Sequence, residues 1–259
     1  MSMWEAISLG LLQGFTEFFP VSSSGHLVMG QTLLGVNIPG ILFELMVHLA
    51  TLLSVVVVYR SRVGGLATGA IKGEPGAWRY LILLALATIP AAAVGLTLGD
   101  QIEELFQSPG TVGFALLFTG AVLWSTRWAE AGKAQVGWRA ALIIGVAQSL
   151  ALVPGVSRAG MTVAMALWLG VPRKQAAEFA FLMLLPAVAG AVLLHAPDLV
   201  EAIRQELAAP LLWGSLAAAV AGVLAIKWFV ALMARDRFHQ FAPYCWTVGA
   251  GFLLYLWLA

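Results

Sequence analysis

Residues 13–26 read QGFTEFFPVSSSGH, and residues 154–162 read PGVSRAGMT. Each stretch places proline, glycine and hydroxyl side chains in the middle of a segment, near 2–35 and near 138–170, that is otherwise apolar. The apolar runs beside each break are too short to cross a hydrocarbon core of about 30 Å, which needs roughly 17 to 25 helical residues. Irregular backbone at that depth is tolerated only where protein or a wet cavity satisfies it. Each segment therefore predicts a re-entrant helical hairpin with the break at its tip.

The rest of the chain is dominated by apolar stretches of membrane-spanning length. Of the 259 residues, 61% are hydrophobic and 10% are charged, against about 25% charged residues in soluble domains. Six stretches are long enough to span, near 41–60, 78–98, 111–128, 175–195, 210–234 and 242–258. We expect an all-α integral membrane protein with six transmembrane helices plus two re-entrant helical hairpins, forming a single transmembrane domain over residues 1–259.

The charges predict both the partner and the orientation. A net charge of +1 gives no basic excess that would favour nucleic acid, so the partner is membrane lipid. Alternating spans bring nearly all loop Lys and Arg residues to one side, which the positive-inside rule makes cytoplasmic. The opposite, external loops carry Asp100, Glu103, Glu104, Asp198, Glu201 and Glu206. Both termini then lie outside.

The chain contains an internal repeat, whose halves cover approximately residues 1–130 and 136–259. The matched residues stand 134 or 135 positions apart: Gln13 with Gln148, Ser22 with Ser157, Gly25 with Gly160 and Glu44 with Glu178. Each half is a hairpin followed by three spans, and three crossings are odd, so the halves form an inverted-topology repeat. In transporters of this design the substrate site lies near the midplane, where broken helices of the two halves meet.

The first tip carries groups that suit phosphate and cations. Gln13 and Glu17 are four residues apart on a helix, so their side chains share a face and can share a cation or a proton. A carboxylate at this depth costs about 2.5–3.5 kcal/mol on insertion scales, so Glu17 should be paired, hydrated or functional. Hydroxyls and exposed amides follow at Ser22, Ser23, Ser24 and Gly25, and the imidazole of His26 comes next.

The second tip adds an anion-binding group. Arg158 offers a rigid fork suited to phosphate, beside the hydroxyls of Ser157 and Thr162. Gly155 and Gly160 let the backbone approach closely. An ion pair of Arg158 with Glu44 or Glu178 is the structural alternative, and it can coexist with function. Together the two tips are suited to phosphoryl transfer or phosphate transport.

Other polar residues receive structural interpretations. His48, His195 and His239 are expected away from the tips, in structural or interfacial roles. Glu44 and Glu178 are expected to hydrogen-bond the hairpin backbones, and a contact of Glu44 with cation or substrate is left open.

The two tip motifs resemble the signature motifs of bacterial undecaprenyl-diphosphate phosphatases, the bacitracin-resistance family. The resemblance implies a hydrolase that removes the terminal phosphate of the C55 isoprenoid diphosphate and regenerates the lipid carrier of peptidoglycan synthesis, which maintains cell shape. It implies a divalent cation, Mg²⁺ or Ca²⁺. It also implies a multi-pass protein of the bacterial inner (plasma) membrane, with its active site open to the periplasmic, external side.

The resemblance also implies roles for individual residues. Glu17 and Gln13 match the motif associated with the cation, and Glu17 is the residue that would act as general acid or base. Ser23 matches the proposed nucleophile and His26 a catalytic histidine. Arg158 matches the diphosphate clamp, with Ser157 beside it and Thr162 at the end of the motif. Ala159 departs from the pattern, because the family often has serine there.

Several questions stay open at this point. Ser23, His26 or water could attack phosphorus, and the preferred cation is undetermined. The oligomeric state is also open, with a homodimer as one option. The competing function is a transporter or flippase for a lipid phosphate.

Overall fold

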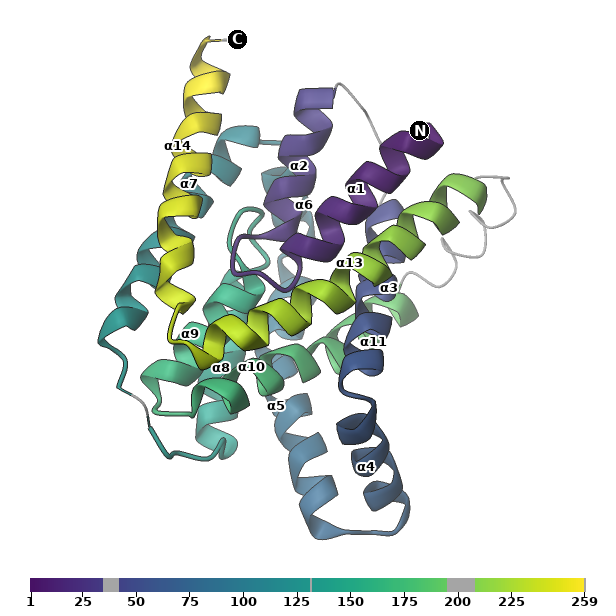
Figure 1. Cartoon of the computed structure of the whole chain (residues 1–259), viewed down its shortest axis with the longest axis vertical. Helices are drawn as coiled ribbons and strands as arrows, with labels where there is room; N and C mark the ends of the chain where they lie inside the picture. The colour runs from purple at the N-terminus through teal and green to yellow at the C-terminus, as the bar shows by residue number, and fades with distance from the viewer. Residues whose placement is uncertain (35–41, 131, 195–207, 259) are drawn as a thin grey trace.

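The computed structural model describes residues 1–34, 42–130, 132–194 and 208–258, which form helices and turns and contain no strand. Figure 1 shows both termini at one end of the molecule and the α4–α5 connection at the other. The helices of the first half are α1 Met3–Thr16, α2 Ser23–Leu34, α3 Leu42–Val58, α4 Arg60–Ile71, α5 Pro75–Thr97, α6 Gly99–Phe106 and α7 Pro109–Ser125. Those of the second half are α8 Trp138–Leu150, α9 Arg158–Trp168, α10 Arg173–Leu182, α11 Leu184–Leu194, α13 Ala208–Ala234 and α14 Ala242–Leu258.

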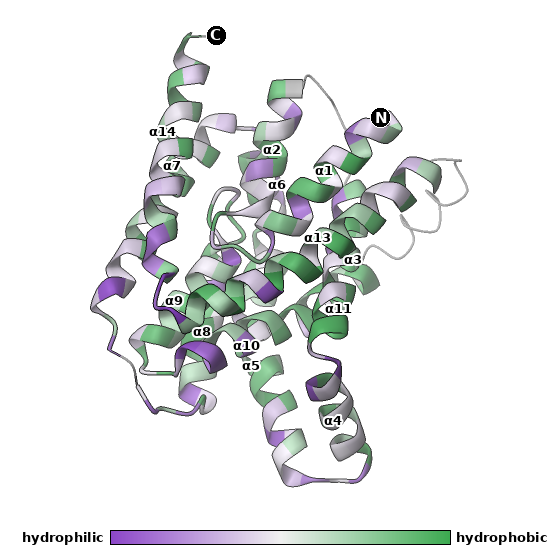
Figure 2. Ribbon diagram, in the orientation of Figure 1, coloured by the Kyte–Doolittle hydropathy of each residue, from purple (hydrophilic) through white to green (hydrophobic). Residues whose placement is uncertain are grey.

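The fold class expected from the sequence is confirmed: the chain is an all-α integral membrane protein. Within the described ranges, five helices are long and apolar enough to cross a membrane, and a sixth is counted if α3 and α4 form one bent span. Apolar residues recur along α3 and the five long helices, as Figure 2 shows, whereas α4 carries fewer of them. The count of six spans stays a prediction, because α3 and α4 meet at an angle of 84°.

Each of the two segments expected to be a hairpin is a pair of short helices around an irregular break. Residues 17–22 separate α1 from α2, and residues 151–157 separate α8 from α9. Ser22 turns the first break at a φ of 68°, and Gly155 turns the second at a φ of 95°. The re-entrant path of these segments through a bilayer stays a prediction.

Contacts at equivalent positions of the two halves support the proposed repeat. A Cβ on Gly10 in α1 would meet the carbonyl oxygen of Gly214 in α13. A Cβ on Gly145 in α8, 135 positions later, would lie 2.5 Å from the carbonyl oxygen of Ala87 in α5. Each half therefore packs the first helix of its broken pair against a long helix of the other half, at a glycine that leaves no room for a side chain.

The two breaks are held by helices that correspond in the same way. The Cys245 thiol of α14 donates to the carbonyl of Pro20 in the first break, at 3.5 Å. The Thr119 hydroxyl of α7 donates to the carbonyl of Gly155 in the second break, at 3.1 Å. Because α7 and α14 each close one half of the chain and pack together, both tips rest on one shared helix pair.

A cluster of aromatic rings anchors the first break in the core. Phe18 is fully buried and packs edge-on against Phe181 of α10, with ring centroids 5.3 Å apart. Phe181 in turn contacts Phe229 of α13, also at 5.3 Å. Because Phe18 directly follows Glu17, this packing fixes the backbone from which the carboxylate projects.

Two helices were not expected from the sequence. The segment that forms α4 contains three glycines and basic residues, which disfavour a helix prediction, but Gly69 lets α4 pack closely on Ala77 of α5. The segment that forms α6 carries three acids and has no buried residue. Tertiary packing of α4 and the amphipathic pattern of α6 therefore produce helices where loops were expected.

The glycine contacts generate a test of the packing. We expect Gly10→Ala and Gly145→Ala each to destabilise the protein by about 1–3 kcal/mol, because an added methyl group overpacks a backbone contact. Thermal unfolding in detergent measures the effect. Gly64→Ala is the matched control, since nothing lies within 4 Å of the added Cβ. Unfolding of all three variants at the wild-type temperature would contradict the close packing.

Candidate active site

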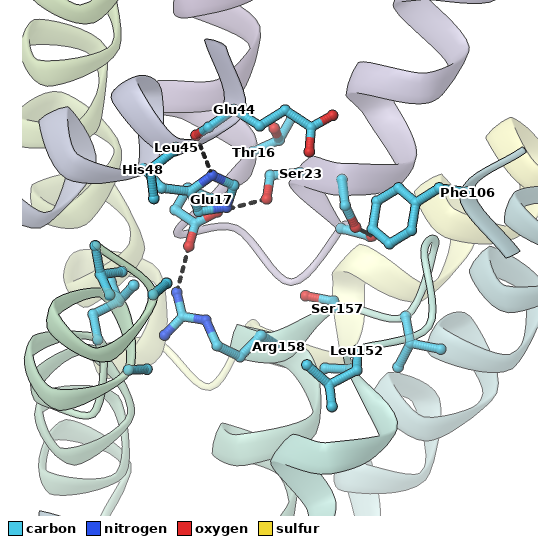
Figure 3. A pocket seen from close by; sticks show the side chains of 18 of the residues that line it. Thr16, Glu17, Ser23, Glu44, Leu45, His48, Phe106, Leu152, Ser157 and Arg158 are labelled. Atoms are coloured by element: carbon cyan, nitrogen blue, oxygen red, sulfur yellow. Dashed lines mark hydrogen bonds and ion pairs between the residues drawn. The ribbon is translucent and has the colours of Figure 1, made fainter. Parts of the chain in front are cut away.

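A cavity of about 370 Å³ lies where the two breaks meet α3, α6 and α11. Its polar side is formed by the two breaks and by α3, as Figure 3 shows. The polar lining residues are Thr16, Glu17, Ser22, Ser23, Ser24, Glu44, His48, Ser157 and Arg158. The structure therefore brings half of the candidate residues together in one cavity, although they come from distant parts of the chain.

Glu17 is the centre of this polar group. Its carboxylate accepts hydrogen bonds from Arg158 Nη2 at 2.6 Å, from the Ser23 hydroxyl at 2.5 Å and from the Gln13 amide at 3.0 Å. His48 Nε2 lies 3.6 Å from Glu17 Oε2. The Glu17 side chain is only 4% exposed. A carboxylate buried to this degree is tolerated because several donors compensate for its lost hydration.

The partner of Arg158 differs from the alternatives considered in sequence. Its ion pair is made with Glu17, and neither Glu44 nor Glu178 is its partner within the described chain. Glu178 instead accepts from Arg62 Nε at 2.9 Å. The Arg158 side chain remains 18% exposed and lines the cavity, so it is held by Glu17 while still reachable by a ligand.

The first tip is shaped by Ser22. Its hydroxyl accepts from the Gly25 N–H at 3.2 Å, and its backbone carbonyl lies 2.8 Å from His26 Nδ1. This turn directs Ser23 and Ser24 toward the cavity. The Ser23 hydroxyl donates to Glu17 and is partly exposed, so its oxygen lone pairs face a space that a substrate can enter.

The second tip repeats this arrangement. Ser157 caps α9, because its hydroxyl accepts from the Gly160 N–H at 3.0 Å. The Ser157 N–H donates to Thr119 at 3.2 Å. A Cβ on Gly25 would lie 2.9 Å from Gly155 Cα, so the two tips touch through their backbones.

Four residues expected to bind substrate are not among the residues that line the cavity, Gly25 at the first tip and Gly155, Gly160 and Thr162 at the second. The N–H of Gly25 donates to the Ser22 hydroxyl. Thr162 is fully buried and donates to the carbonyl of Arg158 at 2.8 Å. These positions indicate that the four residues shape the tips and that Thr162 supports Arg158.

His26 also lies outside the cavity lining. Its Nε2 is 2.8 Å from the Tyr244 hydroxyl, and the two rings stack with centroids 5.8 Å apart. Both ring nitrogens therefore have partners, at Ser22 and Tyr244. These contacts hold His26 at the first tip, away from the cavity lining, and the catalytic role expected for it from the sequence stays a prediction.

Gln13 is likewise buried and absent from the cavity lining. Its amide nitrogen donates to Glu17, and its amide oxygen has no hydrogen-bond partner among the described residues. Gln13 therefore orients Glu17, and its expected part as a cation ligand stays a prediction.

Two residues of α3 complete the site. The expectation that His48 lies away from the tips is wrong, because it lies beside Glu17 and lines the cavity. Glu44 also lines the cavity, and its backbone carbonyl lies 2.7 Å from His48 Nδ1. Their spacing of four residues in an apolar helix is the signal that could have revealed them, since it equals that of Gln13 and Glu17.

The remaining expectations for acids and histidines have mixed outcomes. Neither Glu44 nor Glu178 hydrogen-bonds a hairpin backbone within the described parts of the chain, and Glu178 pairs with Arg62 instead. His239 packs against the Trp124 ring, in line with a structural role. His195 lies outside the described residues.

The wall opposite the polar residues is apolar. It includes Ile102 and Phe106 from α6, Leu152 from the second break, and Leu184 and Val188 from α11. Because polar and apolar walls bound one space, the cavity suits an amphiphile whose head reaches the tips while its tail contacts hydrocarbon.

The carboxylate and hydroxyl oxygens that line the cavity suit a hard divalent cation, which prefers oxygen ligands. No cluster of three or more His, Cys, Asp or Glu side chains suited to a metal is found in the described ranges. Mg²⁺, however, is commonly held by one or two carboxylates together with substrate phosphates and water. Glu17 and Glu44 face the same cavity as Arg158, so two carboxylates oppose one arginine.

The fold and this site define an integral membrane protein with a buried polar site that is open to an amphiphile. The family described as bacitracin resistance protein BacA matches residues 6–251. The chain belongs to this family.

Relatives match over almost the whole chain. An undecaprenyl-diphosphatase of Desulfatibacillum aliphaticivorans is 38% identical and covers 98% of this chain and 99% of its own. One of Desulfosudis oleivorans is 40% identical, with 95% of each chain covered. Undecaprenyl-diphosphatase 1 of Bacillus licheniformis is 38% identical, with 96% of each covered.

The buried ion pair generates a stability prediction. We expect Glu17→Gln or Arg158→Gln alone to lower the free energy of unfolding by about 3–5 kcal/mol, because each leaves a buried charge without its partner. The double variant should lose less than the sum of the two. Thermal unfolding in detergent measures this coupling. Asp236→Asn, at a pair whose carboxylate is 63% exposed, should stay within about 1 kcal/mol of wild type. Strict additivity of the two buried substitutions would disprove the pairing.

Proposed function

We propose that this chain is an undecaprenyl-diphosphate phosphatase, which hydrolyses the terminal phosphate of undecaprenyl diphosphate and yields undecaprenyl phosphate and inorganic phosphate. The observation that carries the proposal is the chain of contacts from the Ser23 hydroxyl to Glu17 to Arg158, at the polar end of a half-apolar cavity. The printed names of the relatives support the substrate. Recycling the lipid carrier by this reaction gives bacitracin resistance.

Ser23 is the group best placed to attack. Ser23 Oγ lies 2.5 Å from Glu17 Oε2 and donates to it, so the carboxylate can accept the hydroxyl proton. A bond forms from Ser23 Oγ to the terminal phosphorus while the bond from phosphorus to the bridging oxygen breaks. Undecaprenyl phosphate leaves, and water then releases inorganic phosphate from Ser23. Direct attack by a water held at Glu17 is the alternative.

Arg158 binds the diphosphate. Its guanidinium reaches into the cavity but is tied to Glu17 before substrate binds. An incoming diphosphate competes for the same donors and thereby releases a carboxylate oxygen of Glu17. Substrate binding and freeing of the base are coupled through one side chain.

Glu17 and Glu44 are the residues that would hold Mg²⁺ or Ca²⁺. A bound cation would neutralise charge on the diphosphate, and it would offset the surplus of carboxylates over arginine in the cavity. Gln13 contributes by orienting Glu17 through its amide. The hydroxyls of Ser22, Ser24 and Ser157 surround the head group, with Gly25, Gly155, Gly160 and Thr162 supporting the tips from behind.

The active site opens to the external, periplasmic side of the bacterial inner membrane. Support comes from α6, which carries Asp100, Glu103 and Glu104 and also lines the cavity through Ile102 and Phe106. Basic loops gather at the opposite end, where positive charge favours the cytoplasm. The inverted repeat, with two re-entrant hairpins, accounts for both tips reaching one cavity. A homodimer stays a prediction of the sequence.

Phosphate release from undecaprenyl diphosphate in detergent tests the proposal. We expect Glu17→Ala and Arg158→Ala each to lower kcat by at least about 100- to 1000-fold, because each removes a group that stabilises the transition state. Ser125→Ala removes a hydroxyl that donates to the carbonyl of Val122, away from the cavity lining, so it should retain wild-type activity. Hydrolysis needs no compartments, whereas transport does, so wild-type protein without phosphate release would favour a transporter.

Cation dependence gives a second test. Chelator should abolish phosphate release, and Mg²⁺ or Ca²⁺ should restore it. Glu44→Gln should raise the cation concentration needed for half-maximal activity by roughly tenfold or more, because one carboxylate ligand is lost. Glu103→Gln removes an acid on α6 outside the cavity lining and should leave the requirement unchanged. An unchanged requirement in Glu44→Gln would remove this residue from the cation site.

A further inference from the structure

A second cavity, of about 520 Å³, lies among α4, α5, α10 and the segment before α8. Figure 1 shows α4 and the start of α5 at the end of the molecule away from the termini. The polar residues that line the cavity are Arg62, Arg79, Tyr80, Gln135, Gln175 and Glu178. None of them lines the Glu17 cavity, so this is a separate space.

Two contacts orient the guanidinium of Arg62 toward the second cavity. Its Nε donates to Glu178 at 2.9 Å, and its plane lies 4.5 Å above the centre of the Tyr80 ring. The Tyr80 ring is itself packed edge-on against Phe179. The contact of Arg62 with Glu178 is made through Nε, so the terminal nitrogens keep donors that can reach a ligand in the cavity.

The charge of the cavity favours an anion. Arg79 makes no ion pair with any described residue, while Glu178 neutralises Arg62. One positive charge is therefore in excess, with the amides of Gln135 and Gln175 as further donors. Arginine forks beside neutral donors are typical of phosphate recognition. A cation is disfavoured, because the single carboxylate already binds Arg62.

The surroundings favour a lipid as the source of that phosphate. Trp78, next to Arg79, is 50% exposed, and Ile71 at the end of α4 is 86% exposed. Tryptophan beside arginine is typical of the level of lipid head groups, and anionic lipids attract basic groups on the cytoplasmic face. We propose that this cavity binds the phosphate of an anionic phospholipid head group at the basic face of the protein, independently of the phosphatase site.

Binding of phosphatidylglycerol to the purified protein, followed by native mass spectrometry in detergent, tests the site. Arg79→Gln should weaken binding by roughly tenfold or more, the scale of one charge-assisted hydrogen bond. The double variant Arg62→Gln with Glu178→Gln should weaken it as well, without leaving a lone carboxylate. Lys72→Gln removes one charge at the same end but outside the cavity lining, and it should bind like wild type.

Further measurements distinguish a lipid head group from free phosphate as the ligand. Phosphatidylcholine should bind more weakly than phosphatidylglycerol. Arg79-dependent binding of inorganic phosphate that displaces the lipid would identify a free anion as the ligand of the same site, whereas failure of inorganic phosphate to compete identifies the lipid head group. Phosphate release by Arg79→Gln should equal that of wild type. Phosphatidylglycerol binding by Arg79→Gln equal to that of Lys72→Gln overturns the proposal.

Discussion

The ion pair between Glu17 and Arg158 joins two parts of the chain that are 141 residues apart. Both groups are largely withdrawn from solvent, and such a pair is tolerated only when the remaining polar atoms find partners. Ser23 and Gln13 supply those partners on one side, and the helix pair α7–α14 holds the backbones on which both charges depend. The aromatic contact of Phe18 and the glycine contacts of α1 and α8 serve the same end, since they fix the distance between the two breaks.

The two tips share one pattern of backbone contacts but carry different side chains. Ser22 and Ser157 each accept the N–H three residues ahead, from Gly25 and Gly160. The next residues of the two tips, Ser23 and Arg158, stand 135 positions apart, and the proposed mechanism gives them unlike roles, as attacking hydroxyl and phosphate clamp. Two tips with similar backbone contacts thus bring two unlike side chains to one carboxylate.

Much of the site could be predicted from the sequence because the informative residues are local. Proline and glycine inside apolar segments marked both breaks, and polar side chains that are costly at this depth marked Glu17, Ser23 and Arg158. The partner of Arg158 could not be predicted, since three intramembrane acids were available and only tertiary packing selects Glu17. The same holds for His26 and His48: local spacing put His26 at the tip, but its ring turns toward Tyr244, while the face of α3 that meets Glu17 brings in His48. The helices α4 and α6 were missed because their local composition is that of loops.

The contact of Gly25 with Gly155 has a consequence for sequence variation at the two tips. A Cβ on Gly25 would lie 2.9 Å from Gly155 Cα, and a Cβ on Gly155 would lie 2.6 Å from the carbonyl oxygen of Val112 in α7. Gly155 also has a φ of 95°, a backbone conformation that residues with a side chain rarely adopt. Neither glycine can therefore accept a larger residue unless the other tip or α7 moves, so substitutions at the two positions are coupled although 130 residues separate them.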